Sequence, residues 1–107
     1  MDILIHSSHV TVTPKLRQLV LRRVHFAMDR HADHIDRVQV WLSEEGMHSG
    51  EHQRCRLVVH TLPHGTVVVE KTCHIQEAAI SRAAEDCERA VRRRIERRRS
   101  GRRRRAA

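Results

Sequence analysis

Arginines recur at helical spacing in the last third of the sequence. Arg82, Arg89 and Arg93 are seven and four residues apart, so a helix would place them on one face, with Arg92 beside them. Arginine binds phosphate through paired hydrogen bonds and stacks on bases. A second side of the same segment carries an apolar stripe made of Ala79, Ile80, Ala83, Ala84, Cys87, Ala90, Val91 and Ile95. The segment therefore predicts a helix with one side for a protein core and another for a polyanion.

A second basic helix is predicted from about Pro14 to about His31. Thr13 is a favourable N-cap residue, and proline is favoured at the first helical position. Leu16, Val20, Val24 and Ala27 form its apolar stripe. Its bases cluster on another side, interleaved with Leu19 and Phe26: Lys15, Arg22, Arg23 and Arg30.

The charge of the chain is both high and local. The formal net charge is +8, with an isoelectric point near 11.1, and most of the excess lies in the final third. From Arg97 to Arg105 there is no apolar residue, and Ser100-Gly101 predicts a helix stop. We expect one domain over residues 1–97 and a flexible arginine-rich tail over 98–107. A charge run is usually only a solvated surface, but two basic helix faces plus this tail favour RNA.

Catalytic and metal sites have little support. The three cysteines show no paired spacing, which argues against a disulfide framework and fits a reducing cytosol. Cys55 and Cys87 fall on apolar faces, whereas Cys73 is the one expected to be exposed. The ten histidines include close pairs such as His6/His9 and His31/His34, but none has zinc-finger spacing. We therefore expect no metal, no cofactor, no small-molecule substrate and no enzymatic activity.

No segment suggests a membrane or secreted protein. The N-terminus lacks the charged and long apolar regions of a signal peptide. No run approaches the roughly 20 apolar residues that span a bilayer. The alanine-rich stripe of the last helix also lacks bulky membrane anchors. We expect a cytoplasmic protein without a membrane partner.

Four segments predict strands: Asp2–His6, Ile35–Leu42, Arg54–Thr61 and Thr66–Thr72. The second and third alternate, with the inward face formed by Val38, Val40, Leu42, Cys55, Leu57 and Val59. Between them, 43–53 is expected to be a mobile loop, and Pro63-His64-Gly65 a tight turn. Trp41 faces outward, where we expect partial burial under a loop. The predicted fold is α+β, in the order β-α-β-β-β-α. Strands two to four form an antiparallel meander, and both helices lie on one sheet face.

This order of elements resembles the ribosome hibernation-promoting factor family of short-type translation inhibitors, also described as sigma-54 modulation proteins. The resemblance covers about residues 1–97. It is carried by Val10-Thr11-Val12-Thr13-Pro14-Lys15-Leu16-Arg17, by the strand from Val38 to Leu42, and by Ala78-Ala79-Ile80. It implies a fold like that of double-stranded-RNA-binding domains.

The resemblance also implies a function. Members bind the small ribosomal subunit, both rRNA and proteins, in the mRNA/tRNA channel, and idle ribosomes under stress or in stationary phase. Arg23, Arg89 and Arg93 match basic positions of the family. The other expected RNA-binding residues follow from the helical pattern: Lys15, Arg22, Arg30, Arg82, Arg92 and Arg97. Ile75-Gln76-Glu77 departs from the family pattern of Asp, Met or Leu, and Tyr, so the start of the last helix is expected to be looser or shifted.

Two alternatives stay open. Older descriptions of the family present its members as modulators of an alternative sigma factor, in which case the partner is an acidic protein. A general RNA-binding protein governed by the arginine tail is the other. Both share the basic surface, so the sequence does not decide between them.

Overall fold

A computed structural model describes residues 1–45, 52–63 and 65–106 of the chain. The elements are β1 (Asp2–Ser8), α1 (Pro14–Met28), a 3₁₀ helix η1 (Asp29–His34), β2 (Ile35–Glu45), β3 (His52–Thr61), β4 (Thr66–Cys73) and α2 (Gln76–Ala106). The predicted β-α-β-β-β-α order is confirmed. None of the described helices is long and apolar enough to cross a membrane.

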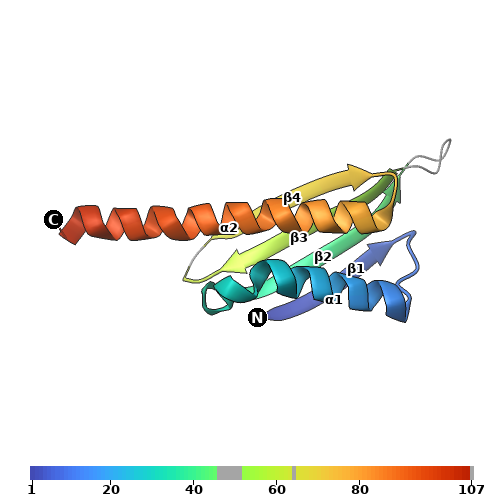
Figure 1. The fold of residues 1–107 in the computed structure, drawn as a ribbon, viewed down its shortest axis with the longest axis horizontal. Coiled ribbons are helices and arrows are strands. Elements are labelled where there is room, and N and C mark those ends of the chain that lie inside the picture. Colours follow the sequence, from blue (N-terminus) through green and yellow to red (C-terminus); the bar gives the residue numbers. More distant parts are fainter. Residues whose placement is uncertain (46–51, 64, 107) are drawn as a thin grey trace.

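The four strands form one mixed sheet in the order β1-β2-β3-β4. β1 is parallel to β2, with Ile3 opposite Val38. The β2/β3 and β3/β4 pairs are antiparallel, so the predicted meander is confirmed. A crossover helix between parallel strands must pack on one face of the sheet. α1 and α2 both cover that face, and the opposite face is left without a helix (Figure 1).

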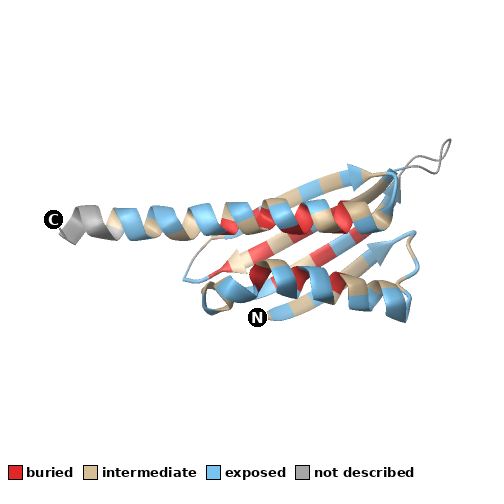
Figure 2. Ribbon diagram, viewed as in Figure 1, coloured by how far each residue is buried: buried red, intermediate tan, exposed pale blue. Residues whose placement is uncertain are grey.

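The core lies between the two helices and the sheet, as the red segments of Figure 2 show. Strand alternation sends one set of side chains into it, namely Val38, Val40, Leu42, Cys55, Leu57 and Val59, all at most 1% exposed. From α1 come Val20, Val24 and Met28. α2 contributes mostly small residues, Ala79, Ala83, Ala84 and Cys87 besides Ile80 and Val91. Small side chains let its backbone lie close to β3 and β4.

The first helix begins where the sequence predicts. Thr13 Oγ1 accepts a hydrogen bond from Leu16 N at 3.1 Å, and Pro14 occupies the first turn. α1 ends at Met28, where a 3₁₀ helix replaces the expected polar break. That tighter turn brings His31 and His34 to half-buried positions beside α2.

The strands around the 43–53 segment are longer than expected. β2 runs on to Glu45 and β3 starts at His52. Both ends are paired, with Glu45 opposite His52 in the register. The rest of the predicted loop, residues 46–51, lies outside the described residues.

The predicted stop at Ser100-Gly101 is wrong, because α2 continues through both residues to Ala106. A glycine inside a helix costs only about 1 kcal/mol relative to alanine. The arginines on both sides are good helix formers, and cations suit a helix C-terminus. α2 therefore projects beyond the sheet, and the molecule is elongated, 58 × 25 × 18 Å (Figure 1). Whether 98–107 behaves as a tail separate from 1–97 stays a prediction.

The start of α2 lies within the unusual Ile75-Gln76-Glu77 segment. The helix begins at Gln76. The carbonyl of Ile75 accepts hydrogen bonds from Ala78 N and Ala79 N, both at 3.1 Å. The first turn is thus formed without the acidic cap of the family pattern.

Candidate nucleic-acid interface

The exposed side of α1 carries a basic stripe. Lys15, Arg22 and Phe26 are seven and four residues apart, so they share one face of the helix, and all three are exposed. Leu19 lies between them and is half-buried. Arg23 and Arg30 are two turns apart and exposed beside this row. The sequence pattern thus correctly separated the solvent side of α1 from its core side.

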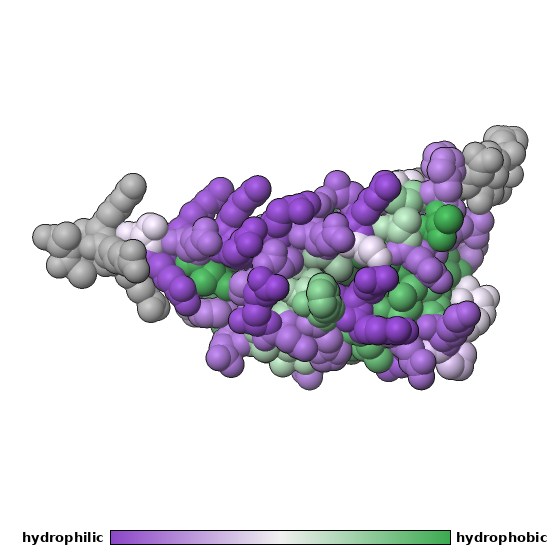
Figure 3. Space-filling model, viewed as in Figure 1, coloured by the Kyte–Doolittle hydropathy of each residue, from purple (hydrophilic) through white to green (hydrophobic). Residues whose placement is uncertain are grey.

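α2 presents a second basic row. Arg82, Arg89 and Arg93 share one face of the helix, and all are exposed. Arg92 and Arg97 are exposed as well. Seen from the helix side, the surface is mostly hydrophilic, with apolar patches between the helices (Figure 3). The exposed lysine and arginines of the two helices give this hydrophilic face its basic character.

Two hollows lie on this face, and residues of α1 and α2 line both. One, of about 280 Å³, is lined by Phe26, Ala27, Arg30, Glu85, Glu88, Arg89 and Arg92. The other, of about 330 Å³, is lined by Thr13, Lys15, Leu16, Leu19, Arg22 and Glu77. Five of the nine predicted RNA-binding residues line one hollow or the other. Arg23, Arg82, Arg93 and Arg97 line neither.

The carboxylate of Glu88 contacts several basic side chains at the first hollow. Glu88 Oε1 lies 3.3 Å from His31 Nε2, 3.8 Å from Arg30 Nη1 and 3.9 Å from Arg92 Nη1. The Glu88 side chain is only 13% exposed. This carboxylate brings Arg30 and His31 of η1 and Arg92 of α2 around one point. Helical spacing alone places Glu88 beside arginines of its own helix only.

A second carboxylate anchors α2 to the sheet edge. Asp86 Oδ2 lies 2.6 Å from Lys71 Nζ of β4, and Arg89 also bonds Asp86. The hydrogen bond from Lys71 is the main cause that lowers the pKa of Asp86 below its ordinary value. By contrast, Glu77 and Glu85 of α2 make no ion pair with any residue that the structure describes.

The predicted RNA-binding residues differ in whether another side chain already contacts their charged groups. Arg30, Arg89 and Arg92 are held by carboxylates, and Arg82 Nη1 lies 3.5 Å from Cys73 Sγ. The remaining five form no ion pair within the described parts of the chain: Lys15, Arg22, Arg23, Arg93 and Arg97. Free, exposed cations have the least to lose when they bind phosphate.

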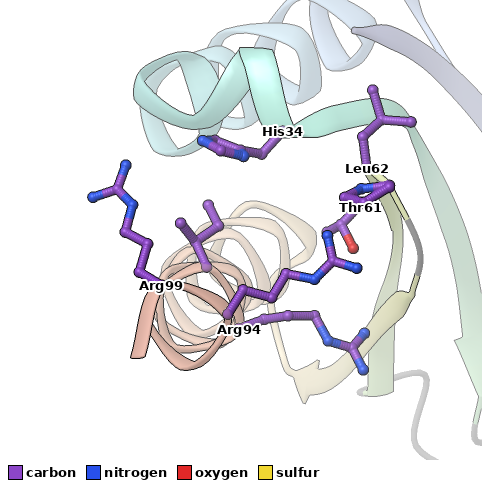
Figure 4. A pocket seen from close by; sticks show the side chains of 8 residues that line it. His34, Thr61, Leu62, Arg94 and Arg99 are labelled. Atoms are coloured by element: carbon purple, nitrogen blue, oxygen red, sulfur yellow. The ribbon is translucent and has the colours of Figure 1, made fainter. Parts of the chain in front are cut away.

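Sequence reasoning missed a third basic locus, at the far end of α2. A hollow of about 100 Å³ is lined by His34, Thr61, Leu62, Pro63, Arg94, Ile95, Arg98 and Arg99. Arg94 Nη1 donates a hydrogen bond to Thr66 O at 2.9 Å. Figure 4 shows Arg94 directed toward the strand end at Thr61 and Arg99 on the opposite side of the helix, near His34. Arg98 and Arg99 are expected from the sequence only as part of a flexible tail, and no local pattern marks Arg94. Only the fold brings the β3–β4 connection close to them.

The cysteines are not arranged for chemistry. Cys55 and Cys87 are 0% exposed, and burial raises the pKa of each thiol to about 12. Both are core residues, as predicted, while Cys73 is partly exposed. In the described parts of the chain, no group of three or more His, Cys, Asp or Glu side chains could hold a metal ion.

Trp41 lies on the open face of the sheet. It is 45% exposed, and its ring is stacked on His6, with centroids 4.0 Å apart. His6 is directly opposite Trp41 in the β1/β2 register. Trp41 is thus exposed, and among the described residues the ring that stacks on it belongs to a neighbouring strand and not to the expected loop.

The fold of the chain is similar to that of solved structures. The chain resembles the N-terminal domain of Protein Y from Thermus thermophilus at 29% identity, with a TM-score of 0.74, covering 87% of this chain and 98% of that one. A ribosomal subunit interface protein from Coxiella burnetii shares the fold at 15% identity, with a TM-score of 0.77, covering 90% and 99%. No curated protein sequence matches significantly. The profile of one family, however, matches residues 3–99. The chain therefore belongs to the sigma-54 modulation protein / S30EA ribosomal protein family.

Proposed function

We propose that this protein is a ribosome-associated hibernation factor. It binds the small ribosomal subunit at the mRNA/tRNA channel through the basic faces of α1 and α2, and it inhibits translation under stress or in stationary phase. Membership of a ribosomal-protein family supports a ribosomal partner, as does the likeness to a subunit interface protein. The observation that carries the proposal is the basic face that α1 and α2 share.

The mechanism is steric and electrostatic. Exposed arginines neutralise rRNA phosphates, and the bound domain then occupies space that mRNA and tRNA need. No bond is made or broken, so the proposal involves no cofactor and no small-molecule substrate. The protein would act in the cytoplasm, where its partner is found.

Co-sedimentation with purified small subunits tests the proposal. The gradients are run at two salt concentrations, each with and without mRNA and tRNA. We expect stoichiometric binding that weakens with salt and is displaced by tRNA. Binding that is unaffected by tRNA would contradict a site in the mRNA/tRNA channel.

One observation favours a second candidate, a general RNA-binding protein. α2 continues past the sheet to Ala106, and its sequence after Gly101 contains four consecutive arginines. Deletion of residues 100–107 separates the two functions. If affinity for small subunits and for unrelated RNA falls together, the end of α2 governs binding. If small-subunit binding persists, the folded domain governs binding.

The family is also described as sigma-54 modulation proteins, which makes an acidic protein the third partner to test. Binding to an acidic protein would also weaken with salt. It would survive nuclease treatment of a cell extract, whereas binding to rRNA would not. Retention of a partner after complete RNA digestion would therefore overturn the ribosomal proposal.

A further inference from the structure

Phe26 is exposed in the middle of the basic face. It is the most exposed large apolar side chain in the described structure, at 84%, ahead of Ile75 at 64% and Val68 at 50%. It lies on α1 four residues after Arg22, so the two share a helix face, and it lines the same hollow as Arg30 of η1. It adds nothing to the core, and an uncovered aromatic ring is unfavourable in water.

The ring borders a hollow rather than a flat surface. Phe26 and Ala27 line it from α1, and Glu85, Glu88, Arg89 and Arg92 line it from α2. With Arg30, three guanidinium groups thus surround an apolar wall. Such a site suits a ligand with a flat ring and an attached anion.

Building on the proposed function, we propose that this hollow receives one unpaired base of the bound RNA. The base stacks on the Phe26 ring, and Arg30, Arg89 and Arg92 hold the flanking phosphates. Stacking on aromatic side chains is the usual way that proteins hold splayed-out bases. A base inside a duplex has both faces covered by its neighbours, so the site selects loops and bulges over paired RNA.

The two acidic residues of the hollow fit a base better than a further phosphate. Glu88 already lies within 4 Å of Arg30 and Arg92 and 3.3 Å from His31 Nε2. Glu85 is exposed and makes no ion pair with the described residues. Its carboxylate repels phosphate but can accept a hydrogen bond from the amino group of adenine, guanine or cytosine. The site is therefore expected to disfavour uracil.

The test uses the full-length protein and two RNA hairpins that differ by one bulged nucleotide. The bulge carries 2-aminopurine, whose fluorescence is quenched by stacking. The variants are Phe26→Leu, which keeps an apolar side chain without a π face, Phe26→Tyr, which keeps the ring, and Val68→Ala as a control on the open sheet face. Small-subunit binding is measured in parallel for each variant.

We expect Phe26→Leu to weaken binding of the bulged hairpin about tenfold and to leave the paired hairpin unchanged. Phe26→Tyr and Val68→Ala should bind as the unaltered protein does. Equal losses for both hairpins, or no loss, would overturn the proposal. If Phe26→Leu weakens only small-subunit binding, the ring contacts a protein; the stacking site is then refuted while the proposed function stands. If the unaltered protein does not bind small subunits, the proposed function itself fails.

Discussion

Glu88 shows how one residue sets the charge of the interface. Its carboxylate lies within 4 Å of His31 and Arg30, both in η1, and of Arg92 in α2. It holds these elements together, yet it also cancels positive charge where RNA is proposed to bind. A carboxylate at position 88 therefore stabilises the fold but weakens the proposed binding of RNA.

Replacing Glu88 by glutamine separates the two effects. We expect Glu88→Gln to lower the free energy of unfolding by about 0.5–1 kcal/mol, because Arg30, His31 and Arg92 lose their negatively charged partner. RNA binding at low salt should tighten severalfold, because Arg30 and Arg92 are freed. Urea denaturation and RNA titration measure the two quantities.

Glu85→Gln is the matched control for that variant. It removes the same charge one turn earlier on α2, where no ion pair is formed with the described residues. Its stability should stay unchanged. An equal loss of stability in both variants would show that the contacts of Glu88 contribute nothing to stability.

Asp86 gives the fold a defined pH dependence. Its pKa is lowered from 3.8 in the folded protein, chiefly by Lys71. A carboxyl group with a lowered folded pKa stabilises the fold above its ordinary pKa, and this contribution is lost as pH falls through the folded value. Asp86→Asn should therefore cost about 0.5 kcal/mol near neutral pH and nothing at strongly acidic pH. Urea denaturation at the two pH values tests this, and a cost that persists in acid would contradict it.

At the level of elements, the two halves of α2 differ: the first packs in the core and the last turns project beyond the sheet. Its first half buries Ala79, Ala83 and Cys87 against the sheet, whereas its last turns extend past it. The extension depends on helix propensity rather than on packing. Gly101 is its weakest point, and a Cβ added there would meet nothing within 4 Å.

Gly101→Ala should therefore strengthen the end of α2. Alanine is favoured over glycine in a helix by about 1 kcal/mol, and there is room for the methyl group. We expect a gain in helical content by far-ultraviolet circular dichroism without a change in the folded core. Gly101→Pro should reduce the helical content. If neither variant changes the spectrum, residues beyond Arg99 are not helical in solution.

For the whole molecule, the two faces of the sheet differ in what they offer a partner. The helix side carries the basic rows on α1 and α2. The open side carries the exposed apolar residues Leu4, Trp41 and Val68, together with Arg37 and Arg56. Both faces carry arginines, so a loss of positive charge weakens RNA binding in general. Two double variants that remove the same charge from opposite faces are therefore compared.

Arg23→Gln with Arg93→Gln should weaken small-subunit binding about tenfold and lower its salt slope by about 1.5, as expected for two lost phosphate contacts. Arg37→Gln with Arg56→Gln changes the net charge equally on the open sheet face, and should have little effect. Binding is measured by sedimentation over a series of salt concentrations. The reverse result would move the interface to the open face of the sheet.

Much of the fold could be read from local pattern. The Thr13-Pro14 start of α1 and the inward faces of β2 and β3 depend on neighbours within one turn or one strand, and these predictions are confirmed. The end of α2 was misread, although it is also local. The cost of one glycine was overestimated against the helix preference of the arginines around it.

The sequence by itself determined which residues are basic and which side of each helix they occupy, because helical periodicity fixes a face without reference to the rest of the chain. Only the tertiary structure decided which of them meet. Glu88 reaches Arg30 and His31 across more than fifty residues, and Asp86 reaches Lys71 from another element. The exposure of Phe26 beside three arginines arises in the same way. Such contacts depend on how α1 and α2 pack on one sheet, and local periodicity carries no information about that packing.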